Sequence, residues 1–141
     1  MDEITFVRKV QDAIESQMPV DRNRTEELIG AVFSALSVRL TATEGRNFIS
    51  QLPTALKELW YWKALFMSAR WGLWDEKEVV KLSKGQFLTT IQIEGGLETP
   101  EEADFVARCV FHVLKEAISP GEVQDAAGQL PSGLREWVLA A

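Results

Sequence analysis

An internal repeat is the feature of this sequence that most constrains its fold. The segment QLPTALKELW at 51–60 returns as QLPSGLREWV at 129–138, a shift of 78 residues (129 − 51). The same shift matches Val32 with Val110, Phe33 with Phe111, Leu36 with Leu114, Leu40 with Ile118 and Glu44 with Glu122. Further upstream a shift of 81 pairs Phe6 with Phe87, so one connecting loop differs in length by three residues (81 − 78). Such a period indicates tandem duplication of one supersecondary unit.

Each copy has the apolar spacing and the start signals of helices. Candidate N-caps, namely Asp2, Asp21, Ser83 and Thr99, precede the apolar stripes. Pro100 then occupies a first helical position, for which its fixed φ is suited. The stretch FLTTIQI at 87–93 is rich in β-branched residues and taken alone could be a strand. Its repeat partner FVRKVQDAI at 6–14 has helical spacing, so we predict helix in both copies.

The repeated Gln-Leu-Pro triplet predicts a corner between two short helices. A capping box precedes it in each copy, Thr41 with Glu44 and Ser119 with Glu122. The helix opened by that box must end at the triplet, because a proline inside a helix removes a hydrogen bond. A fourth helix then starts, with Leu56 or Leu134 facing inward.

These signals predict an all-α protein built from two tandem pseudo-repeats of about four short helices each, forming a two-lobed orthogonal helical bundle. We place the first repeat at 1–66, an aromatic inter-repeat linker at 67–82 and the second repeat at 83–141.

The two halves resemble the bacterial family named domain of unknown function 2267 (DUF 2267). The resemblance rests on the Ser/Thr-x-x-Glu cap, the Gln-Leu-Pro corner and the Leu-x-Glu or Leu-Arg-Glu after it, and it covers nearly the whole chain outside the tryptophan-rich middle. It implies an all-helical bundle of crossing helices and carries over no catalytic residue. Gly45 and the aromatic linker depart from the family pattern and affect the expected local packing.

Composition and charge favour a soluble cytoplasmic protein. The chain has 141 residues, a mean hydropathy of −0.06 and a net charge of −6, which arises entirely from residues 71–141. An acidic surface repels phosphate, so we expect no nucleic-acid binding. A single cysteine excludes an internal disulfide and suits a reducing compartment. The acidic N-terminus does not have the character of a signal peptide, and no stretch has the apolar length of a membrane span.

Cys109 and His112, three residues apart, invite a nucleophile hypothesis. The first repeat carries Ala31 and Ser34 at the equivalent positions, so we interpret the pair as a small buried residue and a surface residue in both copies. One cysteine and one histidine cannot supply a typical zinc site, and no calcium-loop spacing is present. We therefore predict no catalytic residue, no metal site and no cofactor.

The most unusual segment is LWYWKALFMSARWGLWDEKEVV at 59–80. Its candidate interaction residues are Trp60, Tyr61, Trp62, Phe66, Trp71 and Trp74. Three consecutive rings on a helix spread over about 200° of its circumference, at 100° per residue. A stripe that packs one core covers little more than 100°, so at least one ring should lie outside the core. Inter-repeat core, a protein interface, and a small-molecule pocket or membrane surface all remain open for this segment.

We therefore hypothesise a noncatalytic protein-interaction or scaffold module rather than an enzyme. Its partner would be another protein, or a second copy of the chain, bound through the aromatic linker. The alternative is a binder of an apolar small molecule in a cleft between the two lobes, which an apolar pocket with a few convergent polar groups would favour.

Overall fold

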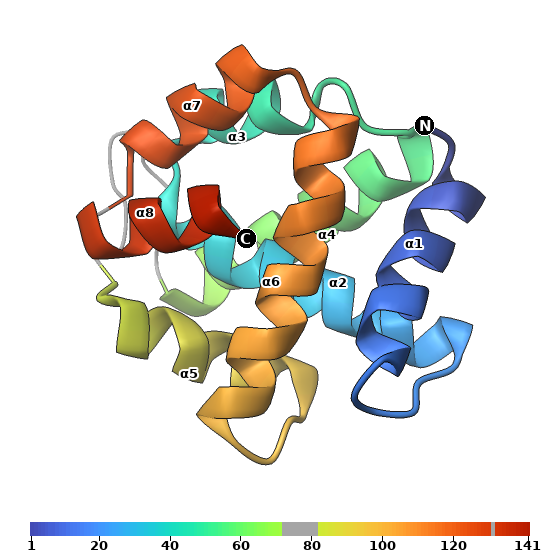
Figure 1. Ribbon diagram of the computed structural model, residues 1–141. Helices are drawn as coiled ribbons and strands as arrows, with labels where there is room; N and C mark the ends of the chain where they lie inside the picture. Colours follow the sequence, from blue (N-terminus) through green and yellow to red (C-terminus); the bar gives the residue numbers. More distant parts are fainter. Residues whose placement is uncertain (72–81, 131) are drawn as a thin grey trace.

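The computed structural model describes residues 1–71, 82–130 and 132–141, and all regular secondary structure within these ranges is α-helical (Figure 1). The helices are α1 (Glu3–Glu15), α2 (Arg22–Arg39), α3 (Ala42–Ile49), α4 (Thr54–Trp71), α5 (Lys84–Gly95), α6 (Pro100–Ala117), α7 (Pro120–Gly128) and α8 (Ser132–Ala140). The all-α prediction is confirmed, and α1 to α4 correspond in order to α5 to α8.

The predicted helix starts are the observed ones. Asp2 and Asp21 accept hydrogen bonds from backbone N–H groups three residues later, at 2.7 Å in each case. Ser83 and Thr99 open complete capping boxes, with reciprocal bonds from Gln86 and Glu102. The helix predicted over FLTTIQI is part of α5, whose end is set by Gly96 in the left-handed region, at φ 60°. Local sequence therefore determines where these helices begin and end.

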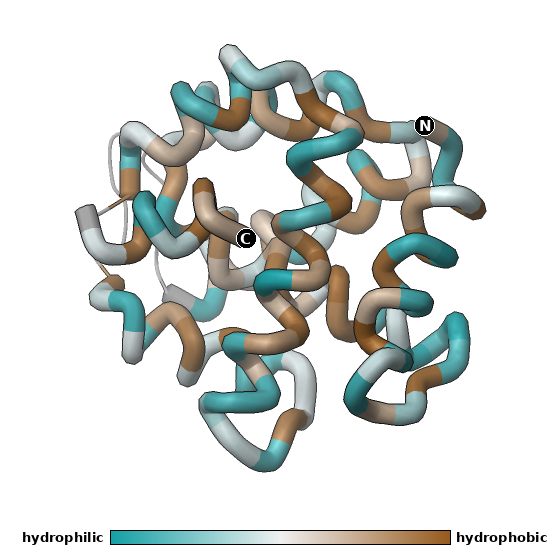
Figure 2. Tube along the Cα trace, viewed as in Figure 1, coloured by the Kyte–Doolittle hydropathy of each residue, from teal (hydrophilic) through white to brown (hydrophobic). Residues whose placement is uncertain are grey.

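Helices from both repeats contribute to the same core. α1 packs against α6 of the other repeat, and α5 packs against α2. In Figure 2 the hydrophobic positions of α1 lie mostly on the side that faces α6. Within the described residues the buried apolar side chains form one cluster, whose largest members include Phe6, Phe33, Phe87 and Phe111. A division into two lobes is not confirmed, because the first helix of each repeat is buried against the second helix of the other.

The two central helices differ in how completely they are covered. α2 contacts α1, α4, α5 and α6, and it is buried almost all round. Ser34 on α2 is fully buried and its hydroxyl donates to the Gly30 carbonyl at 3.0 Å, whereas the equivalent His112 on α6 is exposed. The prediction of a surface residue in both copies is therefore wrong for Ser34. α2 is covered by α4 and α5 as well as by α1 and α6, so even polar positions on it are buried.

Gly45 on α3 makes room for the indole of Trp60. A Cβ at this position would lie 3.2 Å from Trp60 Cζ2, closer than an ordinary van der Waals contact. In the second repeat the equivalent residues are Val123 and Val138, which line one small apolar space in the core. The first repeat thus combines a glycine with a tryptophan where the second repeat has two valines of intermediate size. Such compensation of volume is expected in close-packed cores.

The repeated glutamines cap helices of the opposite repeat. α3 and α7 lie side by side (Figure 1). Gln129 Oε1 accepts from Thr41 N at 3.1 Å, and Gln51 Oε1 accepts from Ser119 N at 2.5 Å. We call this reciprocal pair the glutamine clamp. Each Gln-Leu-Pro corner therefore ends its own third helix and also satisfies an N-terminal N–H of the third helix of the other repeat.

The predicted capping boxes at α3 and α7 are only half formed. Thr41 Oγ1 accepts from Glu44 N at 3.2 Å, and Ser119 Oγ accepts from Glu122 N at 3.4 Å, as expected. The backbone N–H of each N-cap residue donates to a glutamine of the clamp instead of to the glutamate. Glu44 and Glu122 each keep one buried carboxylate oxygen without a hydrogen-bond partner in the described structure. Burial, followed by the charges of Glu122 and Asp125, raises the pKa of Glu44.

We expect Gln51→Ala and Gln129→Ala each to lower the free energy of unfolding by about 0.5–2 kcal/mol, the range for loss of a helix cap. Gln124→Ala is the matched control, since Gln124 is exposed on α7 and its side chain makes no hydrogen bond within the described residues. Urea unfolding monitored by circular dichroism measures the differences. Equal stability of all three variants would show that the glutamine clamp does not stabilise the α3–α7 contact.

The raised pKa of Glu44 predicts a pH dependence of stability. The folded state holds this proton more tightly than the unfolded state, so the stabilising contribution is complete below the unfolded pKa. It is lost as the pH rises through the higher pKa of the folded state. Glu44→Gln should therefore gain stability relative to the wild type as the pH is raised from about 4.5, the usual range for a glutamate, to 7.5. Unfolding titrations at four pH values test this; a constant difference between the two proteins would contradict it.

Candidate functional site

The helix α4 is apolar on two faces. Its inner face carries Leu56, Trp60 and Met67, all buried. Leu59 and Ala64 are partly buried and pack against the same core. A helix that is hydrophobic all round is normally covered on every side. α4 is not, and its second apolar face is exposed.

Four large side chains form this exposed face. The exposed fractions are 48% for Tyr61, 71% for Trp62, 55% for Leu65 and 56% for Phe66. Their positions are i, i+1, i+4 and i+5, which places them side by side on one face of the helix. We call them the aromatic stripe. A contiguous apolar patch of this kind is typical of an interaction surface, whereas scattered exposed apolar residues are common on any protein.

The sequence-predicted interaction residues divide into three groups. Tyr61, Trp62 and Phe66 belong to the aromatic stripe. Trp60 is a core residue, 3% exposed, with its ring edge-on to Phe33 at a centroid distance of 5.3 Å. The side chain of Trp71 and the whole of Trp74 lie outside the described residues.

Leu65 completes the stripe and was not among the sequence-predicted residues. The prediction considered ring-bearing side chains, although Leu65 lies four residues after Tyr61 and so on the same helical face. Residues 67–71 of the predicted linker are helical and belong to α4, while 72–81 lie outside the described residues. The stripe therefore lies on a helix that the core holds rigidly from the other side.

Cys109 and His112 lie in different environments on α6. Cys109 is buried, and burial raises the pKa of its thiol to about 11. His112 is exposed and places its Nε2 3.5 Å from Glu116 Oε1, one turn further along α6. A nucleophilic cysteine needs a lowered pKa, so this environment disfavours a thiolate. In the described ranges, no group of three or more His, Cys, Asp or Glu side chains is positioned to hold a metal ion.

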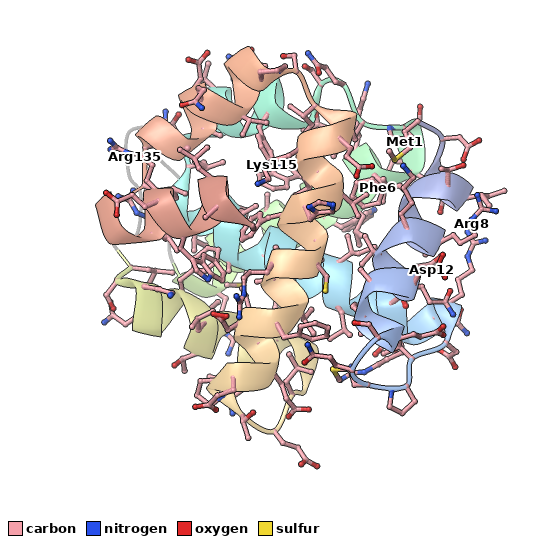
Figure 3. All side chains as sticks on the ribbon, viewed as in Figure 1. Met1, Phe6, Arg8, Asp12, Lys115 and Arg135 are labelled. Atoms are coloured by element: carbon pink, nitrogen blue, oxygen red, sulfur yellow. The ribbon has the colours of Figure 1, made fainter. Side chains whose placement is uncertain are left out.

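An apolar space between the two repeats has a volume of about 20 Å³. Ten of its lining residues are apolar, and Lys115 is the eleventh. The Lys115 ammonium donates to the Leu139 carbonyl at 2.9 Å and to the Ala141 carbonyl, which ties α6 to the end of α8. Figure 3 shows this side chain extending from α6 toward α8. Small-molecule sites usually measure about 300–1,000 Å³, so this space is part of the packed core.

The geometry defines an all-helical protein whose most distinctive surface feature is the aromatic stripe on α4. A family model matches residues 4–137 and is described as "Uncharacterized conserved protein (DUF2267)". The chain belongs to this family, as the resemblance of its two halves indicated. No curated protein matches the sequence. Among the described helices, none combines the length and the apolar character needed to cross a membrane.

We expect the Cys109 thiol to react slowly with iodoacetamide at pH 7.5 in the folded protein, because the thiolate is the nucleophile and a pKa of about 11 leaves little of it. The rate should rise by more than about tenfold in denaturant, where the thiol returns to its ordinary pKa near 8.5. Mass spectrometry of the alkylated protein gives both rates. Fast alkylation of the native protein would contradict the buried environment and reopen a chemical role for Cys109.

Proposed function

We propose that this chain is a noncatalytic protein-interaction module that binds a partner protein through the aromatic stripe on α4. The observation that carries the proposal is the exposure of Tyr61, Trp62, Leu65 and Phe66 on one helical face. Within the described residues, the other exposed large apolar side chains, Met1, Ile4 and Ile93, lie on other segments. The stripe is thus a local concentration of apolar surface.

The composition of the stripe supports binding of a protein. Tyrosine and tryptophan are enriched among the residues that dominate interface energies, because they offer large, rigid and partly polar contact area. Tyr61 with Leu65, and Trp62 with Phe66, are pairs four residues apart, a spacing that also occurs among the anchors of helices that dock in apolar grooves. The buried inner face, with Trp60 and Met67, holds α4 in place, so little conformational entropy is lost on binding.

The cysteine content of the chain suits a reducing compartment. The single cysteine is free and buried, and it makes no disulfide. We therefore propose a cytoplasmic partner. The small-molecule alternative has less support, because the enclosed apolar space between the repeats measures about 20 Å³. The larger space between α1 and α6, of about 440 Å³, is an open hollow at the surface.

Trp62→Gln should abolish capture of partners without changing the fold. We expect its melting temperature to match that of the wild type, since an exposed substitution usually changes stability by no more than about 0.5 kcal/mol. Ile93→Gln is the matched control, an exposed apolar side chain on α5, away from the stripe. Trp60→Ala should instead cost about 3–5 kcal/mol, because it removes a buried ring.

The measurement is affinity capture from a lysate of the native host with quantitative mass spectrometry, together with sedimentation velocity of each variant. Proteins retained by the wild type and by Ile93→Gln but lost with Trp62→Gln support the proposal. Identical partner sets and identical sedimentation for all three proteins would refute it.

A further inference from the structure

A groove lies beside the aromatic stripe, between α1, α2 and the first half of α4. It encloses about 280 Å³ of open space. Its lining residues are Glu3, Val7, Glu26, Ile29, Ala55, Leu56, Glu58, Leu59 and Trp62. Trp62 therefore belongs to both the stripe and the groove, and joins them into one continuous surface.

The floor of the groove is apolar. Val7, Ile29 and Leu56 are almost completely buried, and Leu59 is partly buried. Trp62 contributes the most exposed ring of the described chain. An apolar side chain of a partner could contact this floor while its backbone lay along α4. The floor alone, however, does not distinguish between kinds of partner.

The rim of the groove is acidic. Of the lining residues, Glu3, Glu26 and Glu58 carry carboxylates, and none carries a positive charge. Arg22 Nε lies 3.0 Å from Glu26 Oε1, and Arg22 Nη2 lies 3.7 Å from Glu3 Oε1. Glu58 is exposed and has no ion pair or hydrogen bond in the part of the chain that the structure describes. Glu3 and Glu26 thus share one guanidinium while Glu58 has none among the described residues, and the rim keeps a negative charge.

We infer that this surface binds a basic amphipathic segment of another protein. The inference rests on the proposed function and specifies its partner. An apolar side chain of the segment packs on the groove floor beside Trp62, and Lys or Arg residues that flank it pair with Glu58 and Glu26. Complementary charge of this kind selects partners and raises the rate of association.

A second copy of this chain fits the groove less well. A twofold interface brings identical patches together, so a contact centred on the groove would place Glu3, Glu26 and Glu58 opposite the same carboxylates. Like charges facing each other across an interface disfavour association. The charge pattern therefore favours a basic partner over self-association through the groove.

Two synthetic helical peptides of equal length test the inference. They share the same leucines on one face and carry either lysines or glutamates at the flanking positions. Fluorescence anisotropy measures their binding to the full chain at about 50 and 500 mM salt, where screening differs strongly. We expect the lysine peptide to bind, and its affinity to fall as the salt concentration rises. Its affinity for Glu58→Gln should be about 3–10-fold lower than for the wild type, as for loss of one partly exposed charge pair. Glu101→Gln removes an exposed carboxylate from α6 and is the matched control.

The outcomes separate this inference from the proposed function. The acidic-rim inference is overturned if both peptides bind equally, or if Glu58→Gln and Glu101→Gln have equal effects. Loss of binding in Trp62→Gln would in that case still support the aromatic stripe. The inference is also overturned if the lysine peptide does not bind the wild type. A dimer whose amount depends on protein concentration in sedimentation would instead assign the surface to a second copy of the chain. The proposed function fails separately, if Trp62→Gln captures the same host proteins as the wild type.

Discussion

The rest of the structure depends on one kind of contact, in which the first helix of each repeat packs against the second helix of the other. α1 packs on α6, and α5 packs on α2. A single repeat of this kind cannot bury its apolar face alone, so the two copies complete one core. This arrangement also brings α3 beside α7, where the glutamine clamp can form. The shared interior and the glutamine clamp therefore both follow from contacts between the two repeats.

The aromatic stripe is the outer face of α4, whose inner face packs in the core. α4 is 18 residues long and covers α2, whereas α8 has 9 residues. Gly45 gives the buried ring of Trp60 the space that it occupies. Once Trp60 and Met67 face inward, Trp62 and Phe66 must face outward, because the helical period sets their angular separation. The exposed surface thus follows from how the opposite face of the same helix is packed.

Local sequence signals could predict part of the site and part of the capping. The spacing of Trp60, Tyr61 and Trp62 showed that at least one ring would be exposed, but not which one. That choice depends on Phe33 and Gly45, which come from other helices. In the same way, the Thr41 cap was visible in the sequence, but the acceptor for its N–H lies 88 residues away on Gln129. A capping-box pattern describes residues three apart and cannot identify such a partner.

By itself, the sequence determined the helices, their caps and the duplication, because these depend on hydrogen bonds and apolar spacing within a few residues. Asp2, Asp21, Ser83 and Thr99 cap helices at the positions where the sequence predicted caps. Only the tertiary structure decided that the repeats share one core, that Ser34 is buried while His112 is exposed, and that Glu58 lines a groove with Glu3 and Glu26. These facts depend on which helices meet. That is settled by burial of apolar surface summed over the whole chain, a non-directional force that short sequence patterns do not encode.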